Sequence, residues 1–208
     1  MKKSIVFTKN GTEAVKLQTM DPELAALIDM IGDYTLVLRT DYYKSLIRII
    51  VGQQISVKAA KTIWGRFNSL CETINPASIN VLEDDVIRET GISKPKLIYI
   101  KDLTQKILSE EINFKELENM EDEQVIRQLT RVKGVGRWTA EMFLIFSLGR
   151  LDVFSLNDVG LKRAIKSLYS LASIPVIEEI EELSNKWKPY RSVASLYLWS
   201  ALDQKYIK

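Results

Sequence analysis

A glycine-bearing turn between two predicted helices is the first place where this sequence could do chemistry. Gly134 and Gly136 stand within Val132–Ala140, with Lys133 and Arg137 beside them. Glycine permits the close backbone approach and the unusual dihedral angles that such a turn needs. The helix that begins after Gly136 points its first N–H groups and the positive end of its dipole at the turn, which favours phosphate binding. A connecting turn without a ligand is the alternative.

A carboxylate is the second candidate, because the residues that most often do acid–base work are scarce. The chain has no histidine, and its one cysteine is Cys71. These counts exclude an internal disulfide, a cysteine-rich zinc site and a four-cysteine iron–sulfur cluster. Catalysis must therefore use carboxylate, lysine, tyrosine or backbone groups. Asp158 is a candidate carboxylate; capping the helix that begins at Val159 is its ordinary alternative role, and the two roles are compatible.

The composition is that of an ordinary globular chain. Of the 208 residues, 46% are hydrophobic and 27% charged, so the chain can bury a sizeable core, and its net charge is only +2. Positive charge for a nucleic acid must therefore be local. Three basic clusters are present, each of which is alternatively a solvated helix face: Arg131, Lys133 and Arg137; Lys162, Arg163 and Lys166; Lys58, Lys61 and Arg66.

Nothing in the sequence indicates a membrane partner. No run approaches the roughly 18 to 20 apolar residues that a membrane span needs. The first residues, Met1–Phe7, lack the long apolar core of a secretory signal. We therefore expect a cytoplasmic protein, associated with the nucleoid if the source is bacterial or archaeal.

Helical periodicity dominates from Asp21 onward. Asp21 and Pro22 form a helix start, and Gly32 a plausible stop. Apolar spacing over 43–51 and 57–67 predicts two helices that meet at a polar turn, with Ser56 as the N-cap of the second. Strand-like bias is confined to 4–8 and 34–38, so we expect an essentially all-α chain. Further helices are predicted over 79–89, 95–109, 121–131, 137–148, 158–171, 175–187 and 190–204.

The segment Val132–Ala140 closely resembles the helix-hairpin-helix element of DNA glycosylases. Asp158 stands where the helix-hairpin-helix-Gly-Pro-Asp superfamily has its catalytic aspartate. The resemblance covers about residues 41 to 202 and implies an all-α, two-lobed fold with the active-site cleft between the lobes. Residues 41–148 would form a contiguous helical domain that ends in the hairpin, and 1–40 plus 149–208 a second helical lobe. The β-rich amino-terminal domain of some members would be absent or vestigial.

The resemblance also implies how the hairpin meets DNA. Main-chain carbonyls of Thr130, Val132 and Val135 would hold a monovalent cation, Na⁺ or K⁺, that bridges to a DNA phosphate. The family often has proline where this chain has Lys133, which adds a charge. The hairpin residues expected to contact DNA are Lys133, Gly134, Gly136 and Thr139.

A second DNA-contacting turn matches Gly52–Ser56. Gln54 stands at the position from which the family inserts a side chain into the duplex, where it would fill the space left by a flipped base. Ser56 belongs to the same contacting turn. Glutamines that merely satisfy helix ends are the alternative. Gly91–Lys96 resembles another phosphate-facing turn, with Ser93 as its N-cap.

Trp138 indicates which branch of the family the chain resembles. Relatives that also cut the DNA strand have a lysine nucleophile there, so its absence implies a monofunctional enzyme of the 3-methyladenine DNA glycosylase II branch. An alkylated purine is already cationic, and its glycosidic bond needs little acid assistance to break. Asp158 would stabilise the oxocarbenium-like charge on the sugar and orient or deprotonate the attacking water.

Two tryptophans would form the base pocket. The segment Trp187–Trp199 looks like the carboxy-terminal segment of that branch, and Trp138 and Trp199 would present their π-faces to a cationic base, gaining about 0.5 to 2 kcal/mol. Met142 replaces an aromatic residue and would make the pocket roomier. Core packing is the alternative role of both tryptophans.

These observations predict a monofunctional DNA glycosylase that hydrolyses the N-glycosidic bond of alkylated purines, of the 3-methyladenine type, in duplex DNA. Two alternatives remain: a non-catalytic helix-hairpin-helix module that binds DNA, and a glycosylase for oxidised or mispaired bases. No cofactor is required beyond the structural cation. The chain is expected to act as a monomer.

Overall fold

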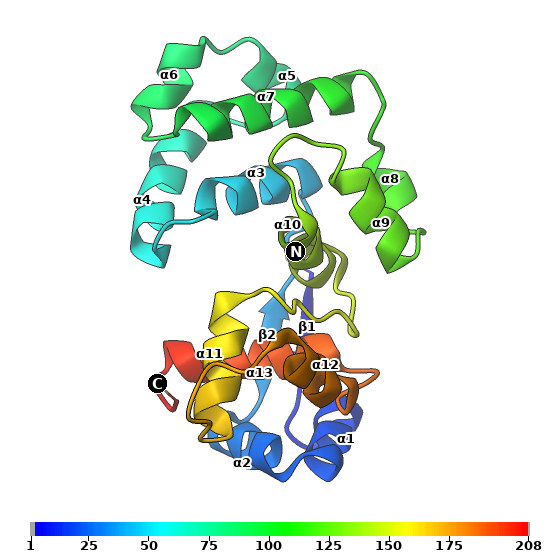
Figure 1. The fold of residues 1–208 in the computed structure, drawn as a ribbon. Helices are drawn as coiled ribbons and strands as arrows, with labels where there is room; N and C mark the ends of the chain where they lie inside the picture. The colour runs from blue at the N-terminus through cyan, green and yellow to red at the C-terminus, as the bar shows by residue number, and fades with distance from the viewer. Residues whose placement is uncertain (1–2, 208) are drawn as a thin grey trace. The chain divides into compact units, whose positions relative to one another are not determined.

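The computed structural model describes residues 3–207 and divides the chain into two compact units. The first unit joins both ends of the chain, Met1–Leu38 and Gly149–Lys208, and the second is contiguous, Arg39–Leu148. Both consist mainly of helices, which confirms the all-α prediction (Figure 1). No helix in residues 3–207 is both long and apolar enough to span a bilayer. The segment Met1–Phe7, which we do not expect to be a secretory signal, begins with Met1 and Lys2. These two residues lie outside the described residues.

A small antiparallel sheet lies in the first unit. β1 (Ser4–Phe7) pairs with β2 (Tyr34–Val37), from Ser4 opposite Val37 to Phe7 opposite Tyr34, so both predicted strands form. Phe7 and Leu36 point from the sheet into the core. The described residues of this unit also form the helices α1 (Thr12–Met20), α2 (Pro22–Ile31), α11 (Val159–Leu168), α12 (Ile177–Asn185) and α13 (Arg191–Asp203).

The core of the first unit forms around α13. Its residues 192–198 are all buried, and α1, α2 and α11 pack against it. Asp21 ties this core together, because it caps α2 by accepting from the Leu24 N–H at 3.1 Å. The same buried carboxylate accepts from the Trp187 indole N–H at 2.8 Å and from the Tyr169 hydroxyl. The predicted helix start at Asp21 is therefore confirmed, with a second role that joins distant segments.

The second unit is a helical domain with α3 (Tyr42–Gly52) near its centre, against which α4 (Val57–Asn68), α7 (Lys94–Leu108) and α10 (Arg137–Phe143) pack. Seven of the residues of α3 are buried, as its apolar spacing predicted. A π-helix, η1 (Leu144–Leu148), continues α10 to the end of the unit. The remaining helices are short: α5 (Pro76–Asn80), α6 (Asp84–Glu89), α8 (Phe114–Leu117) and α9 (Asp122–Leu129).

Three elements differ from the sequence-based prediction. The helix expected over 79–89 is two helices, α5 and α6, because Glu83 is extended and caps α6 while the Lys101 ammonium binds the Leu82 carbonyl at 2.7 Å. α1 was not predicted, since only Ala14 and Leu17 of its residues are buried and its periodicity is weak. α8 was also missed, being a single turn capped by Asn113.

Candidate active site

The glycine turn joins α9 to α10 in the second unit, and its two glycines differ in kind. Gly134 has φ +72°, and a Cβ added to it would lie 2.2 Å from ring atoms of Tyr99 on α7. Gly136 has φ −91° and ψ 178°, which any residue can adopt, and a Cβ there would meet nothing within 4 Å. Gly134 is thus required by packing and dihedral angle, whereas Gly136 leaves open space in front of the N-terminus of α10.

The turn that carries Gln54 is tied to the hairpin by its neighbour. Gln54 is exposed and has φ 55°. The Gln53 carboxamide donates to the Gly134 carbonyl and to the Thr139 hydroxyl, both at 3.0 Å. The Lys96 ammonium holds the other side of the turn by donating to the carbonyls of Val51 at 2.8 Å and Gln53 at 2.7 Å. The two predicted DNA-contacting turns therefore form one hydrogen-bonded assembly.

Two of the predicted DNA contacts have structural roles for their side chains. Thr139 is 2% exposed, and its hydroxyl accepts from Gln53, so its side chain faces the inside of the assembly. Ser56 is the N-cap of α4, as predicted, and its hydroxyl accepts from the Ala59 N–H at 3.2 Å. Lys96 also has a structural role, because its ammonium donates to the carbonyls of Val51 and Gln53. Burial lowers the pKa of this ammonium.

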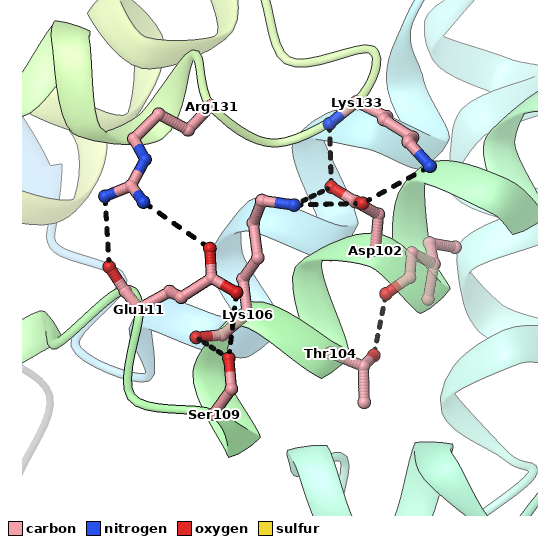
Figure 2. A network of polar contacts seen from close by, with 8 residues as sticks. Asp102, Thr104, Lys106, Ser109, Glu111, Arg131 and Lys133 are labelled. Carbon is pink, nitrogen blue, oxygen red and sulfur yellow. Dashed lines mark hydrogen bonds and ion pairs between the residues drawn. The ribbon is translucent and has the colours of Figure 1, made fainter.

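Asp102 supports the hairpin from below (Figure 2). Its carboxylate accepts from the Lys133 main-chain N–H at 2.9 Å, and the Lys106 ammonium lies 3.0 Å from each of its oxygens. Burial raises the pKa of this carboxyl, but the hydrogen bonds and charges of Lys133 and Lys106 outweigh it, so the pKa lies below its ordinary value. The Lys133 ammonium is mostly exposed and lies 3.8 Å from Asp102, which leaves it on the outer face of the turn.

Arg137, expected as a basic flank of the turn, is engaged by two carboxylates. It pairs with Glu123 on α9 and, at 2.9 Å, with the buried Glu141 one turn along α10. The hydrogen bond that Arg137 donates to Glu123 raises the pKa of Arg137, and these pairs offset its charge. Lys133 is therefore the more available cation of the hairpin.

The predicted catalytic carboxylate lies in the first unit, at the start of α11. Asp158 is 8% exposed and is the N-cap of the helix, as predicted. Its Oδ1 accepts from the Leu161 N–H at 2.8 Å and from the Trp199 indole N–H at 3.1 Å. A Cβ on Gly160 would lie 3.0 Å from that oxygen and 3.3 Å from the indole nitrogen, so a larger residue would crowd the contact between Asp158 and Trp199.

The predicted pocket residues divide between the units. Trp199 contacts Asp158 through its indole N–H, a contact that the sequence did not predict. Trp138 is half-buried on α10, and Met142, one turn further, is 5% exposed. Gly91 has φ +101°, and Ser93 is the N-cap of α7, as predicted for the further phosphate-facing turn. That Trp138, Met142 and Trp199 share one base pocket stays a prediction.

Sequence reasoning missed the residues that hold the two turns. Lys96, Tyr99 and Asp102 follow one another at intervals of three along α7, which places them on one face of that helix. Their spacing was visible in the sequence, but nothing local indicated what they would contact. Gln53 was visible as the neighbour of Gln54 without a role of its own.

Comparison with known proteins agrees with this geometry. Residues 47–189 match the model of the HhH-GPD superfamily of base excision DNA repair proteins. The chain is 36% identical over 190 residues to the alkylbase DNA glycosidase-like protein mag2 of Schizosaccharomyces pombe, a match that covers 88% of this chain and 89% of mag2.

Solved structures show the same fold. The crystal structure of a DNA-3-methyladenine glycosidase from Bacillus halodurans is 38% identical, with a TM-score of 0.83, over 95% of this chain and 92% of that one. The 3-methyladenine DNA glycosylase Mag1 of Schizosaccharomyces pombe, solved in complex with abasic DNA, is 30% identical, with a TM-score of 0.86, over 93% and 97%. The chain belongs to the HhH-GPD superfamily of base excision DNA repair proteins.

Proposed function

We propose that this chain is a monofunctional DNA glycosylase that releases alkylated purines, such as 3-methyladenine, from duplex DNA. The names of its relatives support this activity, and Mag1 was solved with abasic DNA, which is what base release leaves behind. The observation that carries the proposal is the Asp158 carboxylate, shielded from solvent and fixed by two N–H donors. Such an enzyme acts where the genomic DNA lies, in the cytoplasm of a cell without a nucleus.

The reaction needs one anion in a fixed place. The bond between the sugar C1′ and the base nitrogen breaks, its electrons return to the cationic purine, and the base leaves neutral. A water oxygen bonds to C1′, and its proton passes to the carboxylate or to solvent. Asp158 stabilises the positive charge that grows on the sugar and orients that water. Trp138 stands where strand-cutting relatives have a lysine, so no amine is supplied there for a Schiff base.

The second unit would bind the DNA. A phosphate would occupy the open space at Gly136, with Lys133 close by in the turn, and the exposed Gln54 would enter the duplex. The Val132 carbonyl accepts from the Val135 N–H at 3.0 Å and keeps a second lone pair, with which it, together with the Thr130 and Val135 carbonyls, would hold Na⁺ or K⁺. When bound, this cation would offset the charge of the phosphate.

The decisive variant is Asp158→Asn. Asparagine is as good an N-cap as aspartate and can still accept through Oδ1, so helix α11 should survive while the negative charge is lost. We expect release of methylated bases to fall by at least about a hundredfold, since an electrostatic contribution of this kind is worth roughly 3 kcal/mol or more. Affinity for DNA should stay within a fewfold of the wild type.

Asp21→Asn is the matched control. Asp21 is also a buried N-cap that accepts from a tryptophan indole, but its carboxylate belongs to the core around Trp187. Its substitution should lower stability and leave release per folded molecule unchanged. A wild-type protein that binds methylated DNA and releases no base would support the non-catalytic module instead. Full activity in Asp158→Asn would remove Asp158 from the mechanism.

A further inference from the structure

A basic groove between α3 and α4 takes no part in the chemistry above. Two adjoining hollows of about 440 and 260 Å³ share Arg39, Arg48 and Trp64 in their walls. Lys44 lines the larger hollow and Lys61 the smaller. All of these residues belong to the second unit.

The cations of this groove lack acidic partners. Asp41 also lines the larger hollow, but it caps α3 by accepting from the Lys44 N–H at 3.0 Å. Within residues 3–207, none of the four cationic side chains forms an ion pair with a carboxylate. The groove therefore holds positive charge that the protein itself does not neutralise.

Three of these cations lie against aromatic rings instead. The Arg39 guanidinium lies 4.8 Å from the centre of the Phe146 ring, and Lys44 and Arg48 each lie 5.9 Å from the centre of the Trp64 ring. Burial, and then the charge of Arg48, lower the pKa of Arg39 to about 10, so Arg39 is still protonated at neutral pH. Two guanidinium groups thus share one hollow at a cost that a bound anion would relieve.

The groove begins beside Gln54, the side chain proposed to enter the duplex. α4 starts immediately after the turn that carries Gln54, and Val57, its first residue, is 84% exposed. Val57, Lys61 and Trp64 repeat at helical spacing along the face of α4 that lines the smaller hollow. At 1.5 Å per residue, Trp64 lies about 10 Å along the helix from Val57. A DNA strand that passes Gln54 would therefore reach the groove within a few nucleotides.

We propose that this groove binds a backbone phosphate of the DNA strand, a few nucleotides from the flipped base, with Arg39 and Arg48 as its donors. Guanidinium groups suit this task because their planar N–H forks match phosphate oxygens. Trp64 supplies an apolar wall for the adjoining sugar or base. The assignment rests on the proposed function, since it takes the ligand to be DNA.

Arg48→Gln tests the groove with little risk to folding, because Arg48 is exposed. Lys115→Gln is the matched control: it removes one positive charge from the same unit, at an exposed position on α8 that lines neither hollow. Affinity for a duplex with a central abasic site is measured by fluorescence anisotropy between about 50 and 200 mM KCl. Release of methylated bases is measured at saturating enzyme in parallel.

We expect Arg48→Gln to weaken DNA binding about three- to tenfold and to reduce the slope of log affinity against log salt by about one, with base release at saturation unchanged. Lys115→Gln should leave the slope at the wild-type value. Equal slopes in wild type and Arg48→Gln would overturn the proposal. The proposal would also be overturned if inorganic phosphate shifted the NMR signal of the Trp64 indole in the wild type and not in Arg48→Gln, while the DNA salt slopes of the two proteins stayed equal. The groove would then bind a free anion and not the DNA backbone.

The two proposals can fail separately. If the wild type releases no base and Arg48→Gln still reduces the salt slope, the glycosylase assignment fails and the phosphate groove stands. If the wild type releases base and the slopes are equal, the reverse holds.

Discussion

Gly134→Ala gives the sharpest test of how the hairpin is built. The residue has φ +72°, and its added Cβ would lie 2.2 Å from Tyr99 ring carbons. A left-handed backbone costs a residue with a Cβ about 1 to 2 kcal/mol. The contact is also about 1.3 Å inside the usual carbon–carbon separation, and forcing a packed ring aside costs about 1 to 3 kcal/mol. The sum is about 2 to 5 kcal/mol.

Thermal unfolding followed by circular dichroism measures this cost. In a protein of this size each kcal/mol lowers Tm by about 2 to 4 °C, so Gly134→Ala should melt about 4 to 20 °C below the wild type. Gly136→Ala is the control, because its φ is −91° and its Cβ meets open space. The loss of glycine at an N-cap and the reduced entropy of the unfolded chain roughly offset each other there, so its Tm should not move.

A double-mutant cycle separates the two contributions to the Gly134→Ala cost. In a Tyr99→Ala background the ring is gone, and Gly134→Ala should cost only the backbone portion of about 1 to 2 kcal/mol. Gly136→Ala should instead weaken DNA binding, because its methyl group would occupy the space proposed for a phosphate. A Gly134→Ala protein as stable as the wild type, or one that loses no more than Gly136→Ala, would refute the packing argument.

Three further variants test the hydrogen bonds that hold the predicted site residues in place. Gln53→Ala removes two hydrogen bonds to the hairpin, worth about 1 kcal/mol each, and should weaken binding of abasic DNA about three- to thirtyfold in anisotropy titrations; unchanged affinity would show that the two turns act independently. The pKa of Asp102 is lowered in the folded protein, so its carboxylate stabilises the fold at pH values above 3.8, its pKa in the unfolded chain, and this stabilisation is lost as pH falls through the folded pKa. The free energy of unfolding in urea should therefore fall more steeply below about pH 4 for the wild type than for Asp102→Asn. Trp199→Phe removes one donor from Asp158, worth about 1.5 to 3 kcal/mol, and should slow single-turnover base release by up to about a hundredfold; an unchanged rate would mean that the indole N–H does not position the carboxylate.

Local signals in the sequence predicted what is locally determined. Asp21, Ser56 and Asp158 were each predicted as helix N-caps, and each caps its helix through a hydrogen bond to an N–H three residues on. Capping depends on residues close in sequence, so composition and spacing suffice. The strands over 4–8 and 34–38 were predicted from β-branched and aromatic residues in the same way.

Contacts between distant segments were beyond such signals. Asp21 accepts from Tyr169 and Trp187, which lie 148 and 166 residues away, and Trp199 reaches Asp158 across 41 residues. Nothing in the residues around Trp199 distinguishes an indole that donates to a carboxylate from one that stacks on a base. The pairing of Arg137 with Glu123 was not predicted for the same reason, because Glu123 belongs to the preceding helix. The family resemblance predicted which residues form the site, and the fold shows which residues hold them in place.

One face of α7 joins the two turns that are predicted to contact DNA into a single assembly. Lys96 binds the carbonyls of the Gln54 turn, Tyr99 packs under Gly134, and Asp102 accepts from the hairpin N–H of Lys133. A helix is rigid over this distance, so the spacing between the two turns is set by about two turns of α7 rather than by the loops themselves. An enzyme that must hold a strand and insert a side chain at a fixed distance gains accuracy from such a support, because neither turn can shift without breaking a contact to the same helix. Substitutions on this face should therefore alter DNA binding, although none of these side chains needs to touch DNA.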